Sequence, residues 1–84
     1  MHGERVMPSP IDILRRLWWD RSIDFSLARI TFVHRGAPGD VATIEGYDVE
    51  DFDRSFIVLK TGASIPSHRI CRIEHGEAVL FSRE

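Results

Sequence analysis

The first apolar residues after the N-terminus recur at helical spacing. Four of them fall on one stripe and predict a helix over residues 10–19 with this stripe facing a core. The stripe consists of Ile11, Leu14, Leu17 and Trp18. Ser9 and Pro10 favour a helix start here, because Ser is a preferred N-cap and Pro suits the first helical position. On this interpretation Trp18 is a core residue, and Trp18→Ala is expected to cost about 3–5 kcal/mol of stability.

Beyond this helix the pattern changes to short alternating or apolar runs separated by Gly and Pro, which is typical of strands and tight turns. The predicted strands are 28–34, 41–45, 56–59, the short segment 63–65, 68–74 and 78–82. Residues 49–52 are predicted to form a single helical turn. This order predicts an α+β domain, in which one N-terminal helix packs on a small, mainly antiparallel sheet of about five short strands.

The chain length of 84 residues suits one domain. We expect residues 1–8 to be a flexible tail and residues 9–84 to form a single α+β domain. No apolar run is long enough to span a bilayer, so no membrane partner is expected. Cys71 is the only cysteine, which excludes an internal disulfide and favours a reducing compartment; we predict a cytoplasmic protein.

Charge limits the kind of nucleic-acid binding that this chain supports. Its net charge of −2 argues against non-specific coating of nucleic acid, which needs broad positive charge, but it leaves room for a local phosphate site. Ten of the eleven cationic residues are Arg, whose planar fork grips phosphate at two points, and Lys60 is the only Lys. A coding bias toward Arg explains the same count without any function, and from composition alone we favour that explanation.

Histidine and cysteine do not form a metal-binding pattern. The chain has one cysteine and four histidines, of which His2 lies in the predicted tail and His75 in a predicted hairpin turn. A structural zinc site needs about four nitrogen or sulfur ligands, so we predict none. Walker loops, dinucleotide fingerprints and nucleophile elbows are also missing from the sequence, so we expect no cofactor.

Two His-Arg pairs are the candidate site. His34-Arg35 closes one predicted strand, and His68-Arg69 opens another, at strand ends where ligand groups commonly sit. Two such pairs facing one cleft make a compact phosphate receptor. Loop 36–40 is expected to add backbone N–H donors, through Gly36 and Gly39. Trp19 and Tyr47 are the candidates for stacking on a base.

A purely structural role explains the same residues. In that alternative each His bonds a strand-end carbonyl, and each Arg pairs with a carboxylate such as Asp40. From the residue pattern alone we rank this alternative ahead of a phosphate site, because structural ion pairs attract the same residue types.

Three strings of sequence carry a family resemblance. They are ILRRLWWD at 13–20, HRGAPGD at 34–40 and IPSHRI at 65–70, supported by FIVL at 56–59, Gly62 and Gly76-Glu77. From residue 11 onward the chain resembles the RNA cyclic group end recognition domain family. The family often has a Trp near the end of its last strand, where this chain has Leu80-Phe81, and this departure weakens a stacking role there.

The resemblance implies recognition of RNA ends that carry a 2′,3′-cyclic phosphate, in association with RNA-processing enzymes. It raises His34, Arg35, His68 and Arg69 above the structural alternative. The favoured hypothesis is a module that binds RNA 3′ ends. One alternative is a phosphodiesterase that opens cyclic phosphates with the two histidines as acid and base. We favour binding over hydrolysis. Two-histidine phosphoesterases carry Ser or Thr two residues after each histidine, and neither histidine of this chain has one there. A protein-interaction domain with an exposed sheet edge is the third hypothesis.

Overall fold

The computed structural model describes residues 9–83, so the expected tail at 1–8 lies outside the described residues. Within them the chain forms one α-helix and seven strands, which confirms the α+β class and the N-terminal helix. The strands belong to two antiparallel sheets, where a single sheet of about five had been expected. Their bounds are β1 (Ala28–Val33), β2 (Val41–Glu45), β3 (Val49–Phe52), β4 (Phe56–Leu59), β5 (Ser64–Pro66), β6 (Ile70–His75) and β7 (Ala78–Ser82).

Helix α1 (Pro10–Trp19) begins where the sequence predicts it, because Ser9 and Asp12 cap each other. The Asp12 N–H donates to Ser9 Oγ at 3.2 Å, and the Ser9 N–H donates to Asp12 Oδ2 at 3.4 Å. This capping box satisfies two of the backbone donors that a helix start leaves unpaired. Within residues 9–83, no helix combines the length and apolar character needed to cross a membrane.

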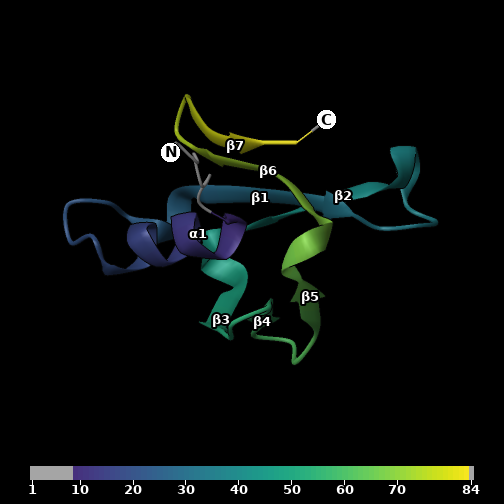
Figure 1. The fold of residues 1–84 in the computed structure, drawn as a ribbon, viewed down its shortest axis with the longest axis horizontal. Helices are drawn as coiled ribbons and strands as arrows, with labels where there is room; N and C mark the ends of the chain where they lie inside the picture. Colours follow the sequence, from purple (N-terminus) through teal and green to yellow (C-terminus); the bar gives the residue numbers. More distant parts are fainter. Residues whose placement is uncertain (1–8, 84) are drawn as a thin grey trace, which may run out of the picture.

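The two sheets have the strand orders β2-β1-β6-β7 and β3-β4-β5. Helix α1 crosses in front of β1, and the three-stranded sheet projects away from the four-stranded one (Figure 1). A single 3₁₀ turn, η4 (Ser67–Arg69), joins β5 of one sheet to β6 of the other. Where β6 begins, its pairing with β1 shifts: Thr31 lies opposite Arg72, but Phe32 lies opposite Ile70. This irregularity lies at the end of β6 that follows η4, and bulges of this kind are common at the edges of sheets.

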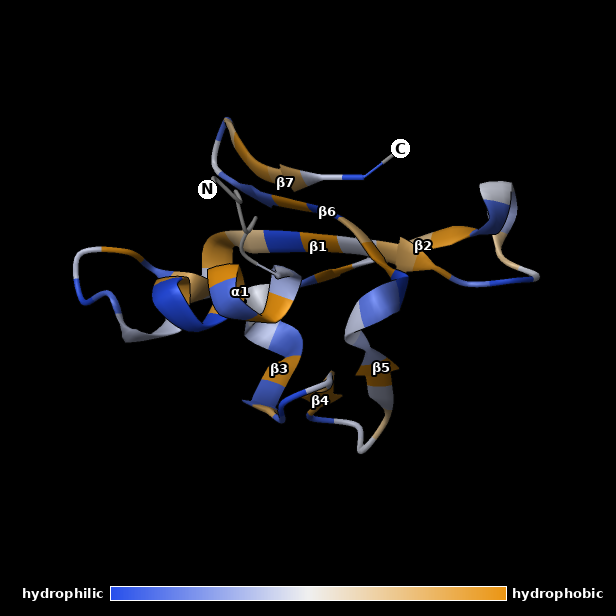
Figure 2. Cartoon of the chain, in the orientation of Figure 1, coloured by the Kyte–Doolittle hydropathy of each residue, from blue (hydrophilic) through white to orange (hydrophobic). Residues whose placement is uncertain are grey.

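One hydrophobic core connects the helix with both sheets. Leu14 of α1, Ile30 of β1 and Ile57 of β4 are all fully buried. Apolar and polar residues alternate along β1, as expected for a strand with one face on the core (Figure 2). The buried cluster consists of Ile11, Leu14, Leu17, Ile30, Phe32, Val49, Ile57, Ile65, Ile70 and Ile73. The sequence therefore identified three of the four stripe residues correctly.

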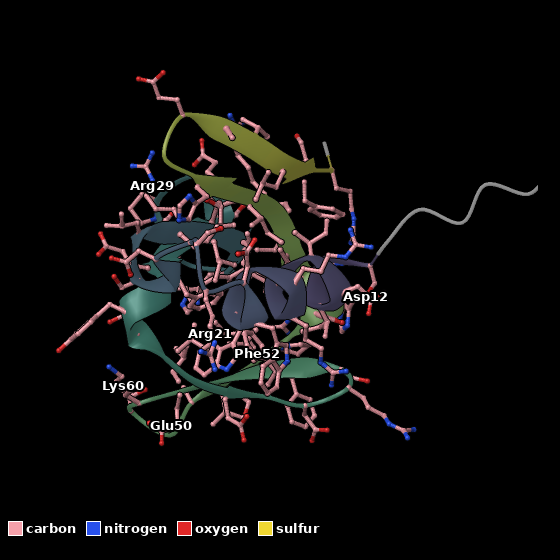
Figure 3. The ribbon with its side chains drawn as sticks, turned by 90° about the vertical axis from the view of Figure 1, so that its left-hand side faces the viewer. Asp12, Arg21, Arg29, Glu50, Phe52 and Lys60 are labelled. Carbon is pink, nitrogen blue, oxygen red and sulfur yellow. The ribbon has the colours of Figure 1, made fainter. Side chains whose placement is uncertain are left out.

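Trp18 is the exception, because its side chain is 40% exposed. Its ring packs edge-on against Phe25, with 5.0 Å between ring centroids, and against Phe52, at 5.1 Å. Figure 3 shows Phe52 beneath α1, on the side of the three-stranded sheet. Trp18 lies at the edge of the apolar stripe, next to the last helical residue, so it covers the rim of the core instead of entering it.

We therefore expect Trp18→Ala to cost about 1–3 kcal/mol of stability, because two edge-to-face pairs contribute about 0.5–1.5 kcal/mol each. This loss is smaller than the loss expected for a fully buried Trp. Thermal denaturation of the variant measures this loss. Trp19→Ala is the matched control, since Trp19 is 77% exposed and should melt as the parent does. Equal melting temperatures for the two variants would show that the three aromatic rings do not stabilise the fold.

The structure corrects several predicted element bounds. Residues 49–52 form strand β3, because Val49 is buried and pairs with Leu59. The helical turn lies just before them, in η3 (Gly46–Asp48), where the Asp48 carboxylate accepts the Glu45 N–H at 3.0 Å. Two further corrections concern the site: β1 ends at Val33, and β6 begins at Ile70, so neither His-Arg pair belongs to a strand.

Turn η3 packs closely on another 3₁₀ turn, η1 (Phe25–Leu27). Gly46 is buried at this contact, and a Cβ atom at its position would lie 1.8 Å from the backbone oxygen of Phe25. Only a residue without a side chain fits there. The close contact between η1 and η3 thus connects the segment after α1 to the start of the three-stranded sheet.

Candidate functional site

The two His-Arg pairs meet at the junction of the two sheets. His34 and Arg35 directly follow β1, while His68 and Arg69 belong to η4, immediately before β6. Since β1 and β6 are paired neighbours, with Phe32 opposite Ile70, the end of β1 lies beside the start of β6. Pairs that are far apart in sequence are thus placed next to each other by strand pairing.

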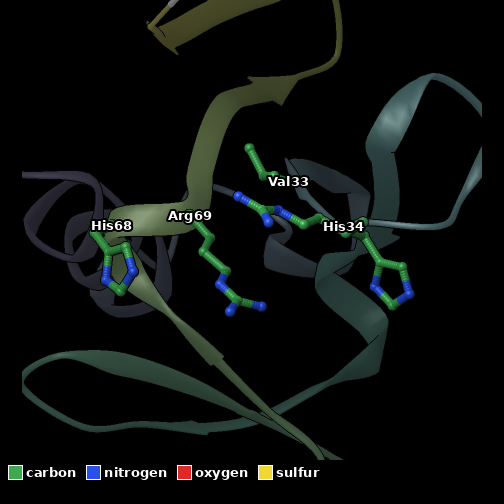
Figure 4. A pocket seen from close by; sticks show the side chains of 5 residues that line it. Val33, His34, His68 and Arg69 are labelled. Atoms are coloured by element: carbon green, nitrogen blue, oxygen red, sulfur yellow. The ribbon is translucent and has the colours of Figure 1, made fainter.

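A hollow of about 630 Å³ lies between these segments. We call it the cationic hollow; its lining is Val33, His34, Arg35, His68 and Arg69. In Figure 4 the Arg69 side chain lies between the His34 and His68 rings. The structure therefore brings together all four residues of the predicted phosphate site.

The polar side chains of the cationic hollow make no ion pair or hydrogen bond within residues 9–83. Neither Arg35 nor Arg69 makes an ion pair there, in contrast to Arg29 and Arg72, which lie 3.8 and 3.2 Å from Glu74. The imidazoles of His34 and His68 likewise make no hydrogen bond to a described residue. No carboxylate of residues 9–83 lines the hollow, so among these residues its two guanidinium groups have no competing anionic partner.

Among residues 9–83, the ion pairs and side-chain hydrogen bonds of the structural alternative are not formed. Asp40, the carboxylate named for a pairing with Arg, accepts instead from the Gly36 N–H at 3.4 Å. The His34 N–H donates to the Asp40 carbonyl at 2.8 Å, which closes the loop.

Gly36 and Gly39 adopt φ values of 95° and 69°, where a side chain is disfavoured. Neither glycine lines the hollow, and the Gly36 N–H is already engaged, so their role as phosphate donors stays a prediction.

Turn η4 is held in place by two contacts that the sequence did not reveal. The Ser67 N–H donates to the Ser55 carbonyl at 2.7 Å, and Arg83 Nη1 donates to the His68 carbonyl at 2.9 Å. The Arg83 N–H also donates to the Cys71 carbonyl at 2.8 Å. Nothing in the local pattern around Arg83 marked it, because its partners come from a distant turn.

The two predicted stacking residues lie elsewhere. Trp19 and Tyr47 are 77% and 65% exposed, and neither lines the cationic hollow. Tyr47 lines a separate space of about 360 Å³, and Lys60 Nζ lies 3.8 Å from the centroid of its ring. The structure therefore does not bring these two aromatic residues to the His-Arg pairs.

A second, smaller space of about 290 Å³ adjoins the cationic hollow and shares His34 and Arg69 with it. We call it the apolar slot; its lining is Phe32, His34, Leu59, Ala63, Ser64, Ile65, Pro66 and Arg69. The Phe32 and His34 rings are edge-on, with centroids 6.0 Å apart. Sequence reasoning missed this slot, although the spacing of two between Phe32 and His34 suits side chains on the same side of an extended chain.

The remaining polar clusters are structural. No group of three or more His, Cys, Asp or Glu within residues 9–83 is arranged to hold a metal ion. His75, placed in a predicted hairpin turn, is the last residue of β6, and its Nε2 lies 2.8 Å from the Asp24 carbonyl oxygen. Hydrogen bonds from the Ser26 side chain and backbone lower the pKa of the Asp24 carboxyl, and Ser22 does the same for the pKa of Asp20. Neither aspartate lines the hollow.

Comparisons with known proteins place the sequence among small domains of one kind. The family model of the MJ1316 RNA cyclic group end recognition domain matches residues 7–83. A UPF0248 protein from Archaeoglobus fulgidus is 38% identical over 65 residues, which are 77% of this chain and 91% of that protein. A UPF0248 protein from Methanopyrus kandleri is 37% identical over 54 residues, or 64% of this chain and 72% of its own length. No solved structure gives a significant match.

Proposed function

Since the chain belongs to the MJ1316 RNA cyclic group end recognition domain family, we propose that it is a small RNA-binding module that recognises phosphate ends of RNA, including 2′,3′-cyclic phosphate. The observation that carries this proposal is the cationic hollow, in which two His-Arg pairs surround a space without a carboxylate. We also place the module in the cytoplasm, beside RNA-processing enzymes, where the Cys71 thiol stays reduced.

The charge pattern supports an end-specific site over a general RNA-binding surface. The chain as a whole carries a net charge of −2, so its affinity must come from a few local contacts. An open terminal phosphate is a monoester, with more non-bridging oxygens and more charge than an internal phosphodiester; a 2′,3′-cyclic phosphate is a diester with the same single charge as an internal linkage, and it differs by lying at the end of the chain. Two guanidinium forks from Arg35 and Arg69 match the extra charge of the open phosphate, while His34 and His68 supply hydrogen bonds to phosphate or ribose oxygens.

Binding is favoured over hydrolysis because no described group forms a hydrogen bond with the side chain of any of the four residues. A histidine that acts as general base is normally oriented by a further group, as in catalytic triads. Within the described chain, the His34 and His68 imidazoles have no such hydrogen-bonded partner. Flexible cationic side chains are adequate for binding an anion, whereas proton transfer in a transition state requires fixed geometry.

The proposal is tested with short RNAs of one sequence that differ only at the 3′ end. The three ends are a 2′,3′-cyclic phosphate, an open 3′-phosphate and a hydroxyl. We expect both phosphorylated RNAs to bind more tightly than the hydroxyl RNA by about tenfold or more, which is the effect of one charged hydrogen bond of about 1.5–3 kcal/mol. Dissociation constants are measured by calorimetry, and amide chemical shifts locate the site at residues 34–35 and 68–69.

The same samples distinguish the other functions. Conversion of the cyclic phosphate into an open phosphate, followed by mass spectrometry, would replace the binding module by a phosphodiesterase. Equal affinity for all three ends would leave only general RNA binding. No binding of any RNA would contradict the proposal and favour a protein-interaction domain.

A further inference from the structure

A phosphate bound in the cationic hollow does not fill the apolar slot. This slot is not a separate surface patch, because it opens beside the cationic hollow and shares the side chains of His34 and Arg69 with it. A ligand group in one space is therefore within a few bonds of a group in the other. A ligand that fills both spaces therefore has an apolar group close to an anionic group.

We propose that the apolar slot receives the base of the nucleotide whose phosphate lies in the cationic hollow. The domain would then bind a whole terminal nucleotide instead of a phosphate alone. This inference rests on the proposed function. A terminal nucleotide has the matching form, since its base and its 2′ or 3′ phosphate are attached to the same ribose and point in different directions from it.

The lining of the slot suits the flat face of a base. Four of its larger side chains are apolar, namely Phe32, Leu59, Ile65 and Pro66. Its volume of about 290 Å³ lies at the lower limit of small-molecule sites, which span about 300–1,000 Å³, so it is large enough for one base. Contact between a base and apolar or aromatic side chains does not depend on base identity, because every base has a π face.

The slot offers few hydrogen-bonding side chains that could distinguish one base from another. Ser64 carries the only hydroxyl in the lining, and the remaining polar side chains are His34 and Arg69, which the phosphate already engages. Base selection normally needs several donors and acceptors arranged against the base edge. The slot thus requires a base to be present without choosing which one.

The first experiment compares two RNAs that end in the same 3′-phosphate. In one the last nucleotide carries its base, and in the other it is abasic. We expect the abasic RNA to bind about fivefold to a hundredfold more weakly, which corresponds to the usual contribution of stacking one base. The methyl resonances of Leu59 and Ile65 should shift strongly with the intact RNA only, because a base ring nearby changes their magnetic environment. The four possible terminal bases should give similar affinities.

A substitution that fills the slot provides the second experiment. Ala63 lines the slot and is exposed, so Ala63→Phe occupies the space without altering the buried cluster. Ala78→Phe is the matched control, because Ala78 is also exposed but lines neither space. We expect Ala63→Phe to bind the intact and abasic RNAs with equal, weak affinity, while Ala78→Phe retains the difference.

The outcomes separate this inference from the proposed function. If the intact and abasic RNAs bind the unaltered protein equally and leave the Leu59 and Ile65 methyls unchanged, the slot does not receive the base. The phosphate site would still stand in that case, and an apolar side chain of a protein partner would become the occupant to test. If neither RNA binds at all, the proposed function fails and the inference fails with it.

Discussion

Arg69→Ala is expected to weaken binding of a 3′-phosphorylated RNA by about tenfold to a hundredfold, and Arg35→Ala by a similar factor. Each change removes a charged hydrogen bond to phosphate, which contributes about 1.5–3 kcal/mol. Both arginines line the cationic hollow and make no ion pair within residues 9–83, so their loss leaves no carboxylate unpaired. The melting temperature should therefore stay close to that of the parent. Calorimetric titration together with thermal denaturation measures both quantities.

Arg29→Ala is the control for net charge. Arg29 lies on β1, outside the hollow, with Nη2 3.8 Å from Glu74 Oε1, so its removal changes the total charge equally. We expect it to affect RNA affinity by less than about threefold at physiological salt, because exposed charges beyond a Debye length are screened. Arg69→Lys should restore only part of the loss, since Lys keeps the charge but not the planar fork. Full affinity in both alanine variants of the hollow would refute the site.

The largest expected effect on stability comes from Gly46→Ala. A Cβ atom at Gly46 would lie 1.8 Å from the Phe25 carbonyl oxygen and 2.8 Å from its carbon, and both atoms belong to the backbone. Side-chain rotation cannot relieve this overlap, so η1 and η3 must separate and expose the aromatic contacts around Phe25. We expect a loss of about 3 kcal/mol or more, which is at or above the upper end for overpacking. That is a large part of the roughly 5–15 kcal/mol typical of a small domain.

Urea denaturation followed by circular dichroism measures this loss, and Gly62→Ala is its control. Gly62 has a φ of 94°, and a Cβ added there would meet no atom within 4 Å, so its substitution carries backbone strain without a clash. A single residue in that region costs roughly 1–2 kcal/mol. A Gly46→Ala variant no less stable than Gly62→Ala would mean that η1 and η3 do not pack as described.

Local sequence signals determined the parts of the fold that depend on neighbours in the chain. The Ser9-Pro10 start and the helical stripe located α1, and alternation located β1. The meeting of the two His-Arg pairs was expected from the motif strings and the family resemblance. Strand pairing between Phe32 and Ile70 supplies the geometry that these strings alone do not contain.

Features that depend on tertiary packing were not predictable from the pattern. Residues 49–52 include two adjacent acidic residues, which suit a turn, yet pairing with β4 makes them a strand. Trp18 continues a helical stripe, but the core ends before reaching it, and Phe25 and Phe52 pack against its ring instead. The apolar slot combines residues of β1, β4 and β5, so it exists only once both sheets are assembled.

The exposure of all four His and Arg side chains around the hollow has an evolutionary consequence. Many functional sites reduce the stability of their own fold, because they bury charge or hold strained backbone. Here the four side chains lie outside the hydrophobic cluster and beside one another, and no described carboxylate lines the hollow with them. Under the proposed function, mutation of these side chains would alter ligand preference while the fold retains its stability, and selection on binding would be largely decoupled from selection on folding.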